Sequence, residues 1–173
     1  MSSQTKFTTS ASVGSSGGST WDNVTFVYTN DSNYATSTLM DSPDHYTKNI
    51  QAVHFDFAIP GKAILLGIEV ETKAKVDDIS EGTTLVCYLT LDGTTGAVGP
   101  KNTDNLTTSD VVYTFGSSSD GWGLTLPSQI NPDTFGVLLG GTTGLSMAGA
   151  IVSVNYIKVT VTYKVKPSII MMF

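Results

Sequence analysis

The sequence predicts an all-β domain: a two-sheet antiparallel sandwich, jelly-roll-like, with a flexible N-terminal arm and a short apolar C-terminal tail. Apolar residues recur at every second position in the longest apolar runs, and clusters of Gly, Asn, Asp, Ser and Pro separate these runs. No segment of about 12 residues shows the 3.6-residue apolar period of an amphipathic helix. About seven or eight short strands separated by turns are typical of a sandwich or a barrel.

The first 20 residues are rich in Ser, Thr and Gly and supply few side chains for a core. Such a segment buries too little apolar surface to offset the entropy lost on ordering, so we expect residues 1–20 to form a flexible arm. The sandwich domain is then expected over residues 21–166. The apolar tail covers residues 167–173, because Pro167 ends the last strand.

The clearest strand is expected over residues 63–76. Apolar and polar side chains alternate there, as in a strand with one buried face. The side chains expected to face the core are Ile64, Leu66, Ile68 and Val70.

Two later runs alternate in the same way. The run 85–91 ends at Asp92-Gly93, a dipeptide that favours a turn. The run 152–165 is expected to bury Ile157, Val159, Val161, Tyr163 and Val165, with Lys158, Thr160, Thr162 and Lys164 facing water. Weaker strands are expected at 24–29, 34–40, 51–59, 111–115 and 134–140, and one helical turn near 127–130, because proline suits a first helical position.

Composition excludes several classes of partner. Charged residues make up only 14% of the chain, the net charge is −6, and all nine cations are lysines. Nucleic-acid binders need basic patches and favour arginine, so nucleic acid is not an expected partner. No apolar stretch approaches the roughly 18 residues of a membrane span, and the N-terminus has no secretion signal. We therefore expect that the protein does not associate with a membrane and that it is made in a cytoplasm.

The side chains that could carry chemistry do not form a catalytic or metal-binding set. His54 and Asp56 would share one strand face, but a zinc or iron site needs a third ligand that the sequence does not show. Glu69 and Glu71 are two apart on a face expected to be solvated, whereas a glycosidase acid needs a desolvated carboxyl group. Cys87 lies in an alternating apolar run and is expected to be a small buried residue.

Aspartates in the loops could bind calcium through their carboxylates, but no D-x-D-x-D-G spacing appears, so a calcium site is only a minority interpretation. The residues concerned are Asp77, Asp78, Asp92 and Asp104. We expect no catalytic residue, no metal and no cofactor, and hence no enzyme.

Trp122 stands in the most distinctive local cluster, Asp120-Gly-Trp-Gly123. Two interpretations are open: an exposed aromatic that stacks on sugar rings, or a loop plug that closes one end of the sandwich. The second is favoured, since isolated aromatics more often pack than bind. Tyr113 and Tyr34 are the other aromatics that could stack on a glycan if exposed.

The C-terminal run is unusually apolar. Five consecutive apolar residues end the chain: Ile169, Ile170, Met171, Met172 and Phe173. An exposed tail of this kind would promote aggregation, so it is expected to pack on its own sandwich or, preferably, on a neighbouring subunit. The sequence therefore predicts a homo-oligomer, with a trimer favoured.

An ordered set of short motifs resembles a group of small β-rich structural proteins of tailed bacteriophages and prophages. The set covers roughly residues 21–163. It consists of Trp21 with Tyr34-Ala-Thr36, Phe55-Asp-Phe-Ala-Ile-Pro60, Ile64-Leu-Leu-Gly-Ile-Glu-Val-Glu71, Phe115-Gly-Ser-Ser-Ser-Asp-Gly-Trp-Gly123, Asn131-Pro-Asp-Thr-Phe-Gly-Val137 and Val154-Asn-Tyr-Ile-Lys-Val-Thr-Val-Thr-Tyr163. The resemblance implies a place in the virion or tail region and no catalytic residue.

The expected function is that of a non-enzymatic virion protein, either capsid decoration or cement or part of a tail appendage, that assembles with itself and with other virion proteins. Such a protein would be made in the host bacterial cytoplasm and end in the virion. The alternative is a carbohydrate-binding, host-recognition module of a tail fibre or spike. A glycan-degrading enzyme is a third option that lacks a visible carboxylate pair.

Overall fold

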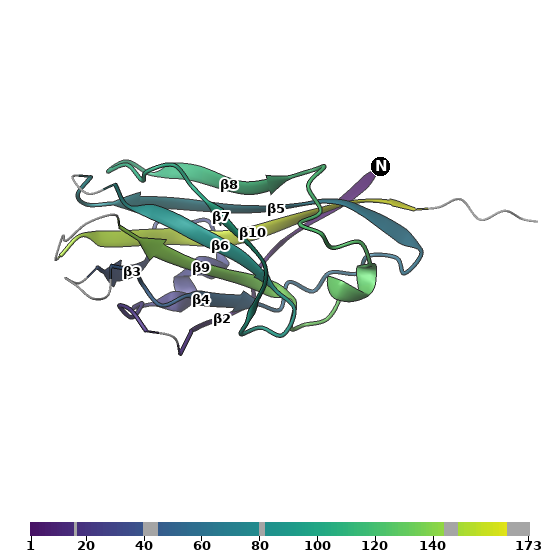
Figure 1. Cartoon of the computed structure of the whole chain (residues 1–173), viewed down its shortest axis with the longest axis horizontal. Coiled ribbons are helices and arrows are strands. Elements are labelled where there is room, and N and C mark those ends of the chain that lie inside the picture. Colours follow the sequence, from purple (N-terminus) through teal and green to yellow (C-terminus); the bar gives the residue numbers. More distant parts are fainter. Residues whose placement is uncertain (16, 40–44, 80–81, 144–148, 166–173) are drawn as a thin grey trace, which may run out of the picture.

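Two antiparallel sheets stack face to face in the described structure (Figure 1). The computed structural model describes residues 1–15, 17–39, 45–79, 82–143 and 149–165. Within these ranges the strands are β1 (Ser2–Phe7), β2 (Ser10–Val13), β3 (Ala35–Thr38), β4 (Ile50–Val53), β5 (Ala63–Val76), β6 (Thr84–Thr90), β7 (Gly96–Asn102), β8 (Val111–Ser117), β9 (Gly136–Thr142) and β10 (Ile151–Val165). Two short 3-10 helices, η1 (Val24–Tyr28) and η2 (Pro127–Gln129), complete the elements.

The strand pairing is nested. Sheet A has the order β1-β10-β5-β8, with β3 pairing the same strand, β10, beyond the end of β1. Sheet B has the order β2-β4-β9-β6-β7. From β3 onward the outermost strands pair first: β3 with β10, β4 with β9, β5 with β8 and β6 with β7. This folded-hairpin pattern, split between two sheets, is the jelly-roll arrangement, and it confirms the predicted fold class.

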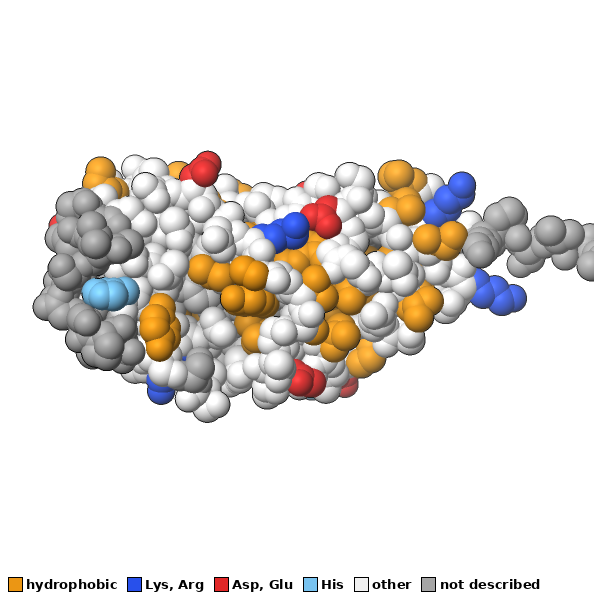
Figure 2. Space-filling view, in the orientation of Figure 1, with side chains coloured by type: hydrophobic (Ala, Val, Ile, Leu, Met, Phe, Trp, Pro, Cys, Tyr) orange, Lys and Arg blue, Asp and Glu red, His pale blue; other side chains and the backbone are white. Residues whose placement is uncertain are grey.

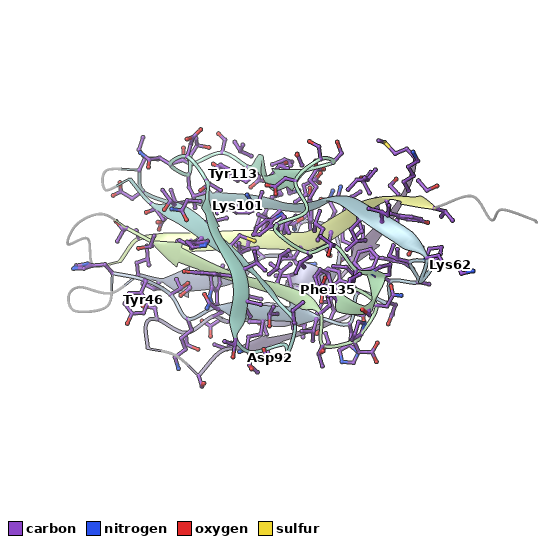
Figure 3. The ribbon with its side chains drawn as sticks, turned by 45° about the vertical axis from the view of Figure 1, so that its right-hand side comes forward. Tyr46, Lys62, Asp92, Lys101, Tyr113 and Phe135 are labelled. Atoms are coloured by element: carbon purple, nitrogen blue, oxygen red, sulfur yellow. The ribbon has the colours of Figure 1, made fainter. Side chains whose placement is uncertain are left out.

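The core lies between the sheets and is apolar. Its largest fully buried side chains come from both layers, for example Ile68 and Ile157 of sheet A and Leu85 and Leu139 of sheet B. Phe135, just before β9, packs against Phe55 and Phe57 and lies among the side chains between the layers (Figure 3). Cys87 is fully buried on β6, as predicted.

A bulge in β5 changes which residues of the clearest strand face inward. Thr162 of β10 pairs with Gly67 but the next residue, Tyr163, pairs with Leu65, so Leu66 is an extra residue on β5. The alternation shifts by one there: Leu65 is buried, whereas Ile64 is 40% exposed. The prediction that Ile64 and Leu66 face the core was therefore wrong.

Gly67 explains why the bulge forms at this point. A Cβ on Gly67 would lie 2.3 Å from the backbone oxygen of Ser117 and 2.2 Å from the carbonyl carbon of Ser118. Only glycine lets the end of β8 pass so close to β5.

A second bulge lies in β10. Val154 pairs with Ala74 and Ile157 with Thr72, so β10 has one more residue than β5 between these pairs. The inward row therefore runs through Val152 and Val154 and then through Ile157, Val159 and Val161. Two predictions at the end of this strand were wrong: Val165 is 47% exposed, and Thr162 is buried.

The predicted N-terminal arm is also wrong over much of its length. β1 pairs with β10 from Ser2 to Phe7, and β2 pairs with β4 from Ser10 to Val13. The side-chain amide of Gln4 exchanges hydrogen bonds with the backbone of Ala58. The segment orders because its backbone completes the edges of both sheets, which requires little apolar burial of its own.

Other differences concern weak signals. Residues 24–28 form η1 where a strand was expected, and β7 was missed because glycines and Pro100 interrupt it. Pro100 is tolerated because β7 is the edge strand of sheet B. The expected strands at 34–40, 51–59, 111–115 and 134–140 correspond to β3, β4, β8 and β9, and the helical turn corresponds to η2.

The β5 bulge can be tested by a pair of substitutions. Leu65→Ala should lower the free energy of unfolding by about 2–4 kcal/mol, because it leaves a cavity, whereas Ile64→Ala should cost less than about 1 kcal/mol. Chemical denaturation of the two variants measures both values. If the alternation instead continued without a bulge through residue 64, Ile64→Ala would be the more destabilising of the two substitutions.

Candidate functional site

The aromatic residues proposed for glycan stacking each make contacts within the protein. Trp122 is 4% exposed, and its indole Nε1 donates a hydrogen bond to the backbone oxygen of Ile68 at 2.9 Å. The Lys101 ammonium lies 4.7 Å from the centroid of the Trp122 ring and forms an ion pair with Asp120 at 2.7 Å. Because Lys101 belongs to β7 and Trp122 follows β8, these contacts join the edges of the two sheets. The indole is the loop plug that the sequence favoured.

Gly116 makes room for this plug. Its φ is +77°, and a Cβ there would lie 2.4 Å from the Trp122 Nε1 atom. A side chain at residue 116 would therefore displace the indole. The Asp120-Gly-Trp-Gly123 motif thus marks a structural closure of the sandwich.

Tyr113 faces the core from β8 and packs against it. Its hydroxyl group is buried and has no hydrogen-bond partner in the part of the chain that the structure describes. This orientation removes Tyr113 from the outer surface and from the glycan-stacking set.

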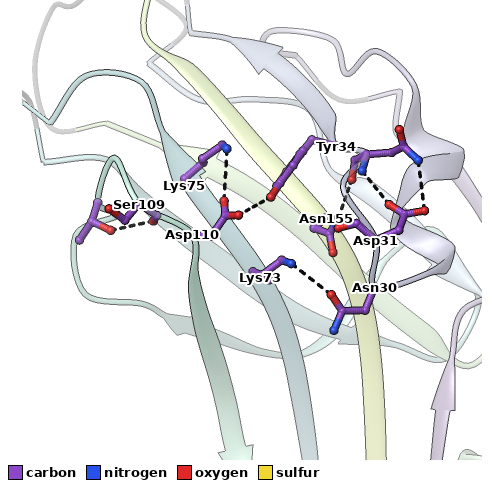
Figure 4. Close-up of polar contacts among 10 residues, drawn as sticks. Asn30, Asp31, Tyr34, Lys73, Lys75, Ser109, Asp110 and Asn155 are labelled. Atoms are coloured by element: carbon purple, nitrogen blue, oxygen red, sulfur yellow. Dashed lines mark hydrogen bonds and ion pairs between the residues drawn. The ribbon is translucent and has the colours of Figure 1, made fainter.

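Tyr34 is enclosed by a polar cluster at the edge of sheet A (Figure 4). Its hydroxyl donates to Asp110 at 2.5 Å, and Lys75 lies 4.4 Å from the ring centroid while pairing with Asp110 at 3.3 Å. Burial and the Asp110 carboxylate raise the pKa of Tyr34 to about 12. Lys75 therefore covers one face of the Tyr34 ring.

Asn155 anchors the same region and was missed by sequence analysis. It is fully buried, and its amide nitrogen donates to the backbone oxygens of Asp31 and Asn33 at 2.8 and 2.6 Å. These bonds hold the turn that leads to β3 against β10. A polar residue interrupting an apolar run, as Asn155 does, is the signal that could have marked this position.

Glu71 is engaged on the outer face of sheet A. Its carboxylate accepts hydrogen bonds from Tyr156 at 2.5 Å and Lys158 at 2.6 Å. Burial disfavours the charge, but the bonds from Lys158 and Tyr156 outweigh it and hold the pKa of the Glu71 carboxyl group below its usual value. Glu71 is therefore fixed in its charged form as a cross-strand partner, which is the opposite of a protonated catalytic acid.

The remaining candidates for metal binding do not converge. Within the described ranges, no three His, Cys, Asp or Glu side chains lie close enough together to hold a metal ion. His54 and Asp56 are both exposed, and both have positive φ, so they lie in irregular chain after β4. Asp92 instead closes the turn after β6 by accepting bonds from the amides of Thr94 and Thr95.

One end of sheet A carries exposed apolar side chains, which we call the apolar end. Ile64 and Val165 lie on paired strands there, 40% and 47% exposed, and Met1 precedes the residue that pairs with Tyr163. Figure 2 shows hydrophobic side chains at the right-hand end of the molecule, with lysine side chains beside them, and a further hydrophobic patch near the middle. The predicted assembly residues Ile169, Ile170, Met171, Met172 and Phe173 lie outside the described residues.

No protein-family model matches the chain. No curated protein matches its sequence either. Among the described residues, no helix is long and apolar enough to cross a membrane.

The Glu71 contacts predict a pH dependence of stability. Since the folded-state pKa is below the unfolded-state value, about 4.5, the carboxylate stabilises the fold above that pH, and this contribution disappears as the pH falls through the folded-state pKa. Glu71→Gln should therefore flatten the loss of stability below about pH 4.5. Urea denaturation over a range of pH measures this effect.

Glu69→Gln is the matched control, because it removes a carboxylate from the same face of β5 and leaves the Tyr156 and Lys158 contacts in place. Identical pH profiles for the two variants would contradict the role assigned to Glu71.

Proposed function

We propose that this chain is a non-enzymatic structural protein of a bacteriophage particle. It is a rigid jelly-roll subunit that assembles with copies of itself and with other virion proteins, as capsid decoration or cement or as part of a tail appendage. Jelly rolls recur in viral capsid proteins, so the fold is compatible with this role, although a fold alone does not define a function. The resemblance of residues 21–163 to phage structural proteins supports the same proposal.

The observation that carries the proposal is the apolar end of sheet A. Ile64 and Val165 are exposed on adjacent strands at the point where the chain continues into residues 166–173. The last five residues of that segment are all apolar. Exposed apolar side chains followed by an apolar segment form a surface that gains stability when a second subunit covers it.

The occupant that we propose for this surface is another copy of the same chain. Closed symmetry lets every subunit cover the apolar end of its neighbour, and a threefold arrangement is favoured. In this proposal the protein is made in the host cytoplasm and is then incorporated into the virion.

Removal of residues 168–173 tests this mode of assembly. The intact chain should sediment as an oligomer, and the truncated chain should sediment at the mass of one subunit, because the apolar contact is lost. Ile64→Lys should weaken association in the same direction, since it places a charge on the apolar end. Analytical ultracentrifugation measures all three masses.

Ile79→Lys is the matched control, because Ile79 is 61% exposed beyond the opposite end of β5. It should leave the mass unchanged. An intact chain that sediments as a monomer, or a truncation that leaves the oligomer intact, would contradict assembly through this end. Absence of the chain from purified particles would reject the virion role itself.

A further inference from the structure

The outer face of sheet B contains two hollows that meet. The larger, of about 550 Å³, extends from the end of β2 across β4 and β9 to the turn before β7, and is lined by Val13, Gly14, Ser15, Asn49, Gln51, Tyr88, Thr94, Thr95, Gly96 and Leu138. The smaller, of about 330 Å³, is lined by Tyr46, Thr47, Asn49, Val86, Tyr88, Gly140, Gly141 and Thr142. Asn49 and Tyr88 line both, so the hollows form one groove, which we call the sheet B groove.

Glycines shape this groove. A Cβ on Gly140 of β9 would lie 2.7 Å from Oδ1 of Asn49, so only glycine leaves the Asn49 amide in place. A Cβ on Gly96 would lie 3.0 Å from the Tyr88 ring, and one on Gly99 would lie 3.2 Å from it. The Tyr88 ring therefore rests against the glycine backbone of β7, which holds an aromatic side chain rigidly between the two hollows.

Several polar groups of the groove have no hydrogen-bond partner in the part of the chain that the structure describes. Among the described residues, the side chains of Tyr46, Tyr88 and Asn49 make no hydrogen bond. Gln51 accepts one from Ser12 at 3.2 Å, and its amide nitrogen remains available. These hydroxyl and amide groups can each both donate and accept hydrogen bonds.

The groove is uncharged. None of the residues that line either hollow is Asp, Glu, Lys or Arg. Phosphate, sulfate and carboxylate ligands are normally held by cations, so this surface does not suit an anionic ligand. A neutral ligand with many hydroxyl groups suits it, because tyrosine rings offer an apolar face while amides and hydroxyls exchange hydrogen bonds with the ligand.

We propose that the sheet B groove binds a neutral oligosaccharide. Tyr88 is the central stacking residue, Tyr46 a second aromatic that is 43% exposed, and Asn49 and Gln51 supply hydrogen bonds to sugar hydroxyls. Each of the two hollows falls within the 300–1,000 Å³ range typical of ligand sites. This site lies on sheet B, whereas Trp122, Tyr113 and Tyr34 pack elsewhere; Figure 3 labels Tyr46 of the groove and Tyr113 of β8.

An array of neutral, sialylated and sulfated glycans tests the proposal, together with amide NMR titration by neutral disaccharides. The intact chain should bind neutral glycans, and the shifted amides should be those of the groove. Tyr88→Ala and Asn49→Ala should each weaken the binding at least about tenfold, because each removes a central contact. Asn49→Ala should not disturb folding, because the Asn49 side chain is partly exposed and makes no hydrogen bond in the described structure. A loss of binding in this variant therefore reports on the groove and not on the stability of the fold.

Phe7→Ala is the matched control, because Phe7 is an exposed aromatic, 38% accessible, on sheet A. It should bind as tightly as the intact chain. No binding to any neutral glycan in both assays would overturn the proposal, as would equal weakening by Phe7→Ala or a preference for sulfated or sialylated glycans. Groove amides that shift with a pool of neutral peptides and not with the sugars would assign the groove to a protein partner instead.

Discussion

The pairing of β10 with β5 is the interaction on which the rest of the structure depends. These two strands are the longest in the described fold, and they are paired from Val152 with Val76 to Val165 with Ala63. β1 and β3 attach to the free edge of β10, and β8 attaches to the free edge of β5. Since sheet B covers the inner face of this pair, the register of β10 on β5 decides which side chains form the core.

Polar side chains do much of the joining between elements, which is consistent with a chain of low charge. Thr72 donates its hydroxyl to the backbone oxygen of Tyr156, Asn155 holds the turn before β3, and Trp122 closes the sandwich onto Ile68. Each of these donor groups is buried and paired with a backbone acceptor, so the desolvation of the donor is compensated. These contacts do not involve the two surfaces proposed for partners, the apolar end and the sheet B groove.

Sequence periodicity predicted the fold class because half-buried strands have a strict two-residue repeat. It predicted the burial of Cys87 correctly, where β6 pairs with β9 in an unbroken register. It misplaced Ile64, because a single bulged residue, Leu66, reverses the alternation in β5, and this bulge lies where β8 closely approaches Gly67. Val165 has the same parity as the buried Tyr163 but is exposed because it lies at the end of β10. Sequence periodicity could not identify β1, because this edge strand is held by backbone pairing with β10 and buries no row of apolar side chains. The sheet B groove brings together residues from five separate segments of the chain, so only the fold reveals it.

Amide hydrogen exchange of the native protein tests the role of the β5–β10 pair most directly. The amides of Val70 and Val159, which lie opposite each other in the regular part of the pair, should be among the slowest to exchange and should open only with global unfolding. The edge strand β1 should exchange faster. Exchange at Val70 and Val159 as fast as in β1 would contradict the account.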